Sequence, residues 1–159
     1  MSIQEELDHL NDYFHIIRVR YENRIELRLN VAENVQLDWP MLKLSLQPIV
    51  ENAIQHGILY KGGKGTVLVT LEVVKDMLSV TVYDDGAGIS EVRLQELMQR
   101  LSEPKAPSKN VGMKNVHDRI KSVCGDEYGL FISSVEHVGT SVCLLLPITE
   151  LPRKVIAHD

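Results

Sequence analysis

The sequence predicts a single α/β domain, because segments of helical and of strand periodicity alternate along its 159 residues. A chain of this length with 44% hydrophobic residues can bury one sizeable core. Cys124 and Cys143 lie in apolar runs without the spacing of a metal site, so we expect small core residues and no disulfide framework. The net charge of -5 argues against a nucleic-acid partner held by general electrostatics.

The distribution of apolar residues and the start of the sequence indicate the cellular location of the domain. No stretch approaches the roughly 18 consecutive apolar residues of a membrane span, and the first residues lack the pattern of a signal peptide. The chain also starts in what reads as the middle of a helix. We therefore expect a cytoplasmic fragment of a longer protein, without membrane contact of its own.

Four segments have apolar residues at helical spacing. They are residues 2–22, 40–57, 90–101 and 112–123. Ser2 and Glu5 are spaced as a capping box at the start of the first segment. Pro40 is expected to open the second helix, where its missing N–H costs little, and Gly57 is expected to end it. His9 and His15 are expected at the surface of the first helix, without a role.

Five segments have the composition and alternation of β-strands. They are residues 24–31, 66–74, 78–83, 128–135 and 140–146. The first alternates apolar and polar residues, which predicts a half-buried strand. Three residues separate the second from the third, which predicts a hairpin or near-hairpin, and the fourth and fifth flank a short link around Gly139.

Within the second helix, the stretch Leu46–Gly57 combines an apolar stripe with polar residues. Asn52 and His56, four residues apart, are expected to lie one above the other along the edge of the helix. Such a pair is typical of a binding site, but also of a buried helix whose Asn and His are satisfied by hydrogen bonds. This segment alone leaves both interpretations open.

Two later stretches favour a ligand site. Asp84-Asp85-Gly86-Ala87-Gly88-Ile89 follows an apolar strand, and its glycines let backbone approach a ligand while a carboxylate accepts hydrogen bonds from an amine. The same motif also fits an ordinary turn or a cation-binding loop. Residues 102–111 have two prolines and no apolar periodicity, which predicts a mobile lid. Gly112 then begins a helix whose free N–H groups suit a phosphate.

The order LQPIVENAIQHG, VYDDGAGIS, VGMKNVHDRI and GTSVCLLLP resembles the N, G1, G2 and final Gly-Thr boxes of sensor histidine kinase catalytic domains. These domains belong to the superfamily of gyrase, Hsp90, histidine kinases and MutL, and QPIVENAIQHG is similar to the LytS and YesM type. The resemblance implies a Bergerat-type ATP-binding fold, a two-layer α/β sandwich with a mixed five-stranded sheet and helices on one face. It divides the chain into a linker helix at residues 1–22, a catalytic domain at 23–150 and a tail at 151–159.

The resemblance also implies roles for individual residues. Asn52 would bind Mg²⁺, with His56 near the phosphates. Glu51, about 100° around the helix from Asn52, is a poorer candidate for a catalytic base. Asp84 would accept the adenine amino group, and Thr140 would support it directly or through water. The further positions matched to ATP are Gly86, Gly88, Ile89, Gly112, Met113 and Asn115. Arg119, one turn after Asn115, matches a position of less certain role.

Two positions depart from the pattern of the superfamily. Asn110 replaces the first of the paired glycines in the G2 box, which affects lid flexibility or phosphate geometry. Pro48 stands where gyrase-like ATPases carry an acidic residue, so efficient ATP hydrolysis is not expected. Transfer to a histidine needs less help, because a neutral imidazole already has a lone pair.

The implied function is transfer of the ATP γ-phosphate to a histidine on a dimerisation domain absent from this chain. Neither His9 nor His15 matches the phosphoacceptor motif of the subfamily. The implied partners are that dimerisation domain and a response regulator, in a membrane-bound parent. The alternatives are an anti-sigma serine kinase of the same fold, a nucleotide-gated module like gyrase and Hsp90, and a degenerate interaction domain.

Overall fold

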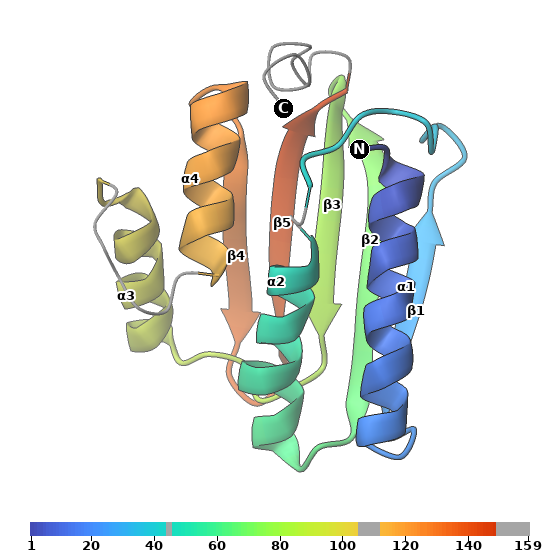
Figure 1. Ribbon diagram of the computed structural model, residues 1–159. Coiled ribbons are helices and arrows are strands. Elements are labelled where there is room, and N and C mark those ends of the chain that lie inside the picture. The colour runs from blue at the N-terminus through green and yellow to red at the C-terminus, as the bar shows by residue number, and fades with distance from the viewer. Residues whose placement is uncertain (44–45, 105–111, 149–159) are drawn as a thin grey trace.

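The computed structural model describes residues 1–43, 46–104 and 112–148, which form a sheet with helices over one of its faces (Figure 1). The five strands lie in the order β1-β2-β3-β5-β4. β1 pairs with β2 in parallel and all other neighbours are antiparallel, so the sheet is mixed. This arrangement confirms the two-layer α/β sandwich that the sequence resemblance implied.

Helices and strands alternate along the chain, singly or in small groups. In chain order they are α1 (Ile3–Arg20), β1 (Ile25–Val31), α2 (Leu46–Asn52), the π-helix η1 (Ala53–Ile58), the 3-10 helix η2 (Leu59–Lys61), β2 (Gly65–Val74), β3 (Met77–Asp84), α3 (Glu91–Ser102), α4 (Gly112–Cys124), β4 (Gly129–Val135) and β5 (Gly139–Pro147). Among these helices, none is both long and apolar enough to cross a membrane. The predicted lid at residues 102–111 and the predicted tail lie mostly or wholly outside the described residues.

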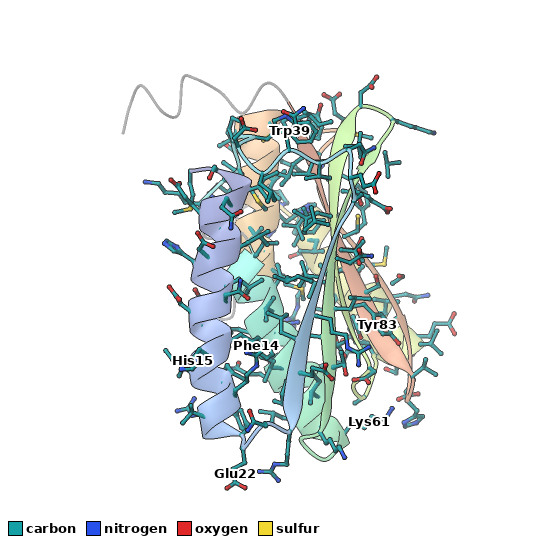
Figure 2. The ribbon with its side chains drawn as sticks, turned by 90° about the vertical axis from the view of Figure 1, so that its right-hand side faces the viewer. Phe14, His15, Glu22, Trp39, Lys61 and Tyr83 are labelled. Atoms are coloured by element: carbon teal, nitrogen blue, oxygen red, sulfur yellow. The ribbon has the colours of Figure 1, made fainter. Side chains whose placement is uncertain are left out.

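The first helix packs into the same core as the rest of the domain. Ser2 and Glu5 form the expected capping box at its start. Its apolar stripe is buried against the sheet and α2, and Phe14 is completely enclosed (Figure 2). His15 points away from the domain, as expected for a surface residue (Figure 2).

The β2–β3 hairpin is confirmed, with its turn at Lys75 and Asp76. Both residues have positive φ angles, 49° and 63°. A two-residue type I′ turn requires this conformation, and its twist matches that of the flanking strands. The hairpin places Asp84 at the far end of β3, opposite Val67 of β2.

The start and end of the second helix were wrongly predicted. The helix begins at Leu46, not at Pro40, because Pro40 forms a bridge with Ser2 and the Met41 N–H donates to the Met1 carbonyl at 2.7 Å. Pro48, in the first turn, is tolerated because the first four N–H groups of a helix have no partner within it. The helix also continues past Gly57 and ends at Gly62, whose φ of 89° suits a helix C-terminus.

Candidate functional site

The predicted site residues of the second helix lie where it changes its winding. Asn52 is the last α-helical residue, and residues Ala53–Ile58 form a π-helix. Short π-helical turns are rare and occur frequently at functional sites. His56 is exposed on this turn, with its ring edge-on to Tyr60 at 6.0 Å between centroids.

The π-helix brings backbone against the end of β3. A side chain at Gly57 would place its Cβ 2.8 Å from the Asp84 Cγ, which is closer than any real contact. A Cβ at Gly86 would in turn collide with the Gly57 backbone, and the Ala87 N–H donates to the Gly57 carbonyl at 3.0 Å. Two glycines therefore let the helix and the loop after β3 meet backbone to backbone beside the carboxylate.

The Asp84 carboxylate is buried, with a relative exposure of 3%. One oxygen, Oδ1, accepts a hydrogen bond from the Gly86 N–H at 2.9 Å, which leaves Oδ2 as an acceptor for a ligand. Burial raises the pKa of Asp84 to about 6, with a smaller rise from Asp85 and an opposing effect of the Gly86 N–H. At neutral pH the group is therefore mostly an anionic acceptor shielded from solvent.

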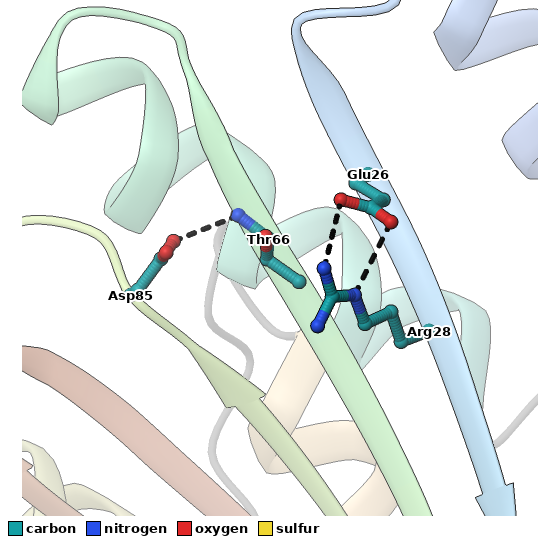
Figure 3. A network of polar contacts seen from close by, with 4 residues as sticks. All are labelled: Glu26, Arg28, Thr66 and Asp85. Carbon is teal, nitrogen blue, oxygen red and sulfur yellow. Dashed lines mark hydrogen bonds and ion pairs between the residues drawn. The ribbon is translucent and has the colours of Figure 1, made fainter.

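The adjacent carboxylate has a structural role. Asp85 Oδ1 accepts from the Thr66 N–H at 2.8 Å, as Figure 3 shows. The Lys61 ammonium donates to the Asp85 carbonyl and to the His137 carbonyl, both at 3.3 Å, and so links η2 to two loops. The exposed Glu26–Arg28 ion pair in the same figure lies on β1 and contributes little to stability.

Asp84 lies in a row of polar side chains that crosses three strands. It is in register with Thr140 of β5, which is in register with Ser134 of β4. Directly paired residues of antiparallel strands project on the same face. The buried Val67, opposite Asp84 on β2, identifies that face as the one covered by helices.

The loop after β3 is held to the β4–β5 hairpin. The Ile89 N–H donates to Ser134 Oγ at 2.8 Å, and the His137 N–H donates to the Ala87 carbonyl at 2.7 Å. Gly88 has a φ of 69° and lies against the hairpin backbone, where a Cβ would collide with Val135 and Glu136. The predicted ligand-contacting loop is thus rigidly positioned.

The two predicted catalytic residues on α2 have different neighbours. The Asn52 amide nitrogen contacts the Met113 sulfur of α4 at 3.7 Å. Glu51 accepts from the Gln47 side chain at 3.2 Å, and its charge contributes, after burial, to raising the pKa of Tyr13 on α1 to about 12. Asn52 therefore faces α4 and Glu51 faces α1, so these two side chains do not converge.

The start of α4 lies beside α2. A Cβ at Gly112 would be in ordinary contact with Pro48, at 3.7 Å. Asn115 is exposed and lines a hollow on α4 with Asp118, Arg119, Lys121 and Ser122. Met113 is thus the predicted α4 residue that the structure joins directly to Asn52.

Asn52 is the predicted metal ligand, and its surroundings suit a cation that is held mostly by phosphates and water. Among the described residues, no group of three or more His, Cys, Asp or Glu side chains could hold a metal ion. With its nitrogen directed at Met113, Asn52 offers its amide oxygen, a single neutral ligand. Mg²⁺ is commonly bound by one or two protein groups, with phosphates and water supplying the rest.

Sequence reasoning missed three residues that shape the site. Gly57 was predicted to end a helix, Ser134 fell within a predicted strand, and Lys61 had no predicted role. Ser134 faces its partners only because of the register of β4 with β5. The glycine next to His56 was the one available sequence signal for the close approach to Asp84.

Comparisons with known proteins agree with this geometry. The model of the family "Histidine kinase-, DNA gyrase B-, and HSP90-like ATPase" matches residues 38–150. YwpD of Bacillus subtilis strain 168 is 34% identical over 150 residues, covering 94% of this chain and 51% of its own length. Sensor protein kinase HptS of Staphylococcus aureus strain USA300 is 30% identical over 149 residues, covering 94% of this chain and 28% of its own length.

Solved structures share the fold. The catalytic domain of histidine kinase ThkA superposes with a TM-score of 0.66 at 17% identity, covering 94% of this chain and 95% of that one. The histidine kinase domain of a blue-light activated kinase from Erythrobacter litoralis gives 0.64 at 18% identity, covering 100% and 66%. The chain thus matches a solved catalytic domain over 94% of its length, but spans about half or less of the length of the curated relatives.

Proposed function

Because this chain belongs to the family of histidine kinase-, DNA gyrase B- and HSP90-like ATPases, we propose that it is the ATP-binding catalytic domain of a sensor histidine kinase. It transfers the γ-phosphate of ATP to a histidine on a dimerisation domain outside this chain. The observation that carries the proposal is the buried Asp84 carboxylate, with one oxygen free for an amine beside the Gly57–Gly86 contact.

The adenine base is held by Asp84, with Thr140 beside it and the backbone of Gly86, Gly88 and Ile89 around it. The backbone at Gly57 packs directly against the Asp84 carboxylate. In this proposal the carboxylate is the polar group that contacts the edge of the base. An anionic acceptor matches the exocyclic amine of adenine and rejects the carbonyl that guanine carries at the same position. This chemistry supports ATP rather than GTP as the substrate.

The phosphates lie toward α2 and the start of α4, near Asn52, His56 and Gly112. The free N–H groups and positive end of α4, a 13-residue helix, suit an anion. Mg²⁺, when bound, would neutralise phosphate charge and align the γ-phosphoryl group for transfer. Asn52 would supply its amide oxygen to that ion, with its amide nitrogen directed at Met113.

The transfer requires positioning more than proton removal. Pro48 stands on α2 next to Gly112, at the position where the resemblance to gyrase-like ATPases implies an acidic residue. Glu51 faces α1 and has no part in the proposal. A neutral imidazole attacks through its own lone pair, so alignment and electrostatic stabilisation supply most of the catalysis.

The partners follow from the same activity. They are the histidine-bearing dimerisation domain of the parent protein, and a response regulator that receives the phosphoryl group. A relative is named a sensor protein kinase, and the histidine kinase ThkA has been solved in complex with the response regulator TrrA. We propose that the parent is a membrane-bound sensor, with this domain in the cytoplasm.

A reconstituted phosphotransfer assay tests the proposal. The chain is mixed with MgATP and a separate histidine-bearing helical domain, and acid-labile phosphohistidine is measured. Asn52→Ala should lower transfer by about 100-fold, because the metal loses its protein ligand. Gln55→Ala, on the exposed side of the same turn, should leave transfer unchanged.

Two outcomes would contradict the proposal. Transfer to serine instead of histidine would identify the chain as a serine kinase of the same fold. Failure to bind MgATP in a calorimetric titration would leave only an interaction domain. A large loss of melting temperature in Asn52→Ala would instead assign Asn52 a structural role.

A further inference from the structure

The hydroxyl of Ser134 is the centre of a hydrogen-bond network beside the proposed adenine site. It accepts from the Ile89 N–H at 2.8 Å, donates to the Gly139 carbonyl at 2.9 Å, and lies 2.8 Å from Thr140 Oγ1. Three neighbours on one small side chain leave little freedom in how its single hydrogen is used.

The direction of each bond follows from the chemistry of the groups. A serine hydroxyl has one hydrogen and two acceptor positions. The Gly139 carbonyl can only accept, so it takes the Ser134 hydrogen. The third bond therefore uses the hydrogen of Thr140, and Ser134 accepts both from Thr140 and from Ile89.

This assignment determines what Thr140 can offer a ligand. Its hydrogen is directed to Ser134, so its remaining lone pairs can only accept. The neighbouring Asp84, in register on β3, is also an acceptor when ionised. Ligand atoms or water that meet Asp84 and Thr140 together must therefore donate hydrogen bonds.

We propose that Ser134 is a specificity-determining residue, which makes the Thr140 hydroxyl an obligatory acceptor and so favours a 6-amino over a 6-oxo purine. This inference rests on the proposed function and deepens it. Ser134 acts through Thr140 and is a positioning residue, without contact to the base of its own.

Without the Ser134 hydroxyl, Thr140 can rotate and donate. A 6-oxo group would then find one donor and one acceptor in place of two acceptors, while a 6-amino group would still find Asp84. The lost bond to Ile89 weakens both nucleotides alike, because it loosens the loop that both would contact. The ratio of the two affinities separates these effects.

The experiment compares MgATP with MgITP, which carries a 6-oxo group in place of the amine, by calorimetric titration of the whole chain. It is run at pH 8, where Asp84, with a pKa of about 6, is ionised. The wild-type chain should bind ATP more tightly than ITP. Ser134→Ala should reduce that preference by about five- to tenfold.

Matched variants make the result specific. Ser133→Ala, at an exposed neighbouring position, should keep the wild-type preference. Ser134→Thr retains the hydroxyl and should also keep it. In a Thr140→Val background, Ser134→Ala should cause no further change in preference, because the group through which it acts is gone. Ser134→Cys, close in size, repeats the test if Ser134→Ala folds poorly.

Equal losses of ATP and ITP affinity in Ser134→Ala would overturn the inference, since they would indicate a purely structural role. A further change in the Thr140→Val background would overturn it as well. Failure of the wild-type chain to bind MgATP would overturn the proposed function and this inference together. The inference alone fails when ATP binds normally and the preference does not move.

Discussion

Asp84 meets two opposing demands. A buried carboxylate is a strong acceptor for an amine, but its charge loses hydration when the chain folds. The raised pKa, about 6, expresses that cost. The residue thus reduces the stability of the free domain, and under the proposed function the same carboxylate recognises the ligand, a conflict typical of functional sites.

The first prediction concerns Asp84→Asn, which keeps the acceptor for Gly86 but removes the charge. At pH 7.5 it should stabilise the free domain by about 1–2 kcal/mol and weaken ATP binding by about tenfold or more. Because the folded pKa is raised, the contribution of Asp84 to stability is full below its unfolded pKa of 3.8 and is lost as the pH rises through about 6.

The stabilisation by Asp84→Asn should therefore shrink as the pH falls from 7.5 to 4. Urea unfolding of both proteins across this range measures it, with the exposed Asp38→Asn as control. A gain in stability that is the same at every pH would contradict the inference that the buried charge of Asp84 destabilises the domain.

At the scale of elements, the π-helix η1 and the loop after β3 act as one unit. Gly57 and Gly86 pack backbone on backbone, and the Ala87 N–H joins the loop to the helix. Lys61 and the β4–β5 hairpin hold the loop from its other sides. The position of Asp84 is therefore determined by three elements that are distant in sequence.

Gly57→Ala tests this arrangement. Its methyl group would occupy the space of the Asp84 carboxylate, so the helix or the carboxylate must move. ATP affinity should fall at least about tenfold, and unfolding free energy by about 1–3 kcal/mol. The measurements are calorimetric titration and urea unfolding. Gln55→Ala, exposed on the same turn, should change neither, and unchanged ATP affinity in Gly57→Ala would refute the close contact.

At the scale of the whole molecule, α1 is part of the folded unit. Its apolar side chains join the same core cluster as those of α2 and the sheet. Residues 1–22, expected as a linker from the missing domain, therefore carry a face that the catalytic domain needs. The boundary between linker and domain in the parent stays a prediction.

Phe14 provides the test. It is fully buried between α1 and the sheet, whereas Ile16, two residues later, is 64% exposed. Phe14→Ala should lower the unfolding free energy by about 3–5 kcal/mol, and Ile16→Ala by less than about 0.5 kcal/mol. Chemical denaturation of both variants gives the comparison. Similar small losses would mean that α1 is dispensable for the fold.

Local patterns predicted most of the elements, because hydrophobic period and turn chemistry act over a few residues. The capping box at Ser2 and the β2–β3 hairpin follow from such patterns and are confirmed. Pro40 misled the prediction of the second helix, since a proline suits both a helix start and a bridge to another segment. Only the packing of the N-terminus against it decided between them.

Sequence motifs, through their resemblance to a known family, were enough to predict the two-layer fold and the family, and they named Asp84 as a candidate acceptor. Folding is needed to show which distant groups meet near Asp84: Gly57 through a π-helical turn, Lys61 through two carbonyls, and Ser134 through strand register. The difference lies in the distance along the sequence over which each interaction acts. Periodicity and turn preference are local properties of the chain, whereas the direction of a hydrogen bond and the space beside a carboxylate depend on neighbours that only folding brings together.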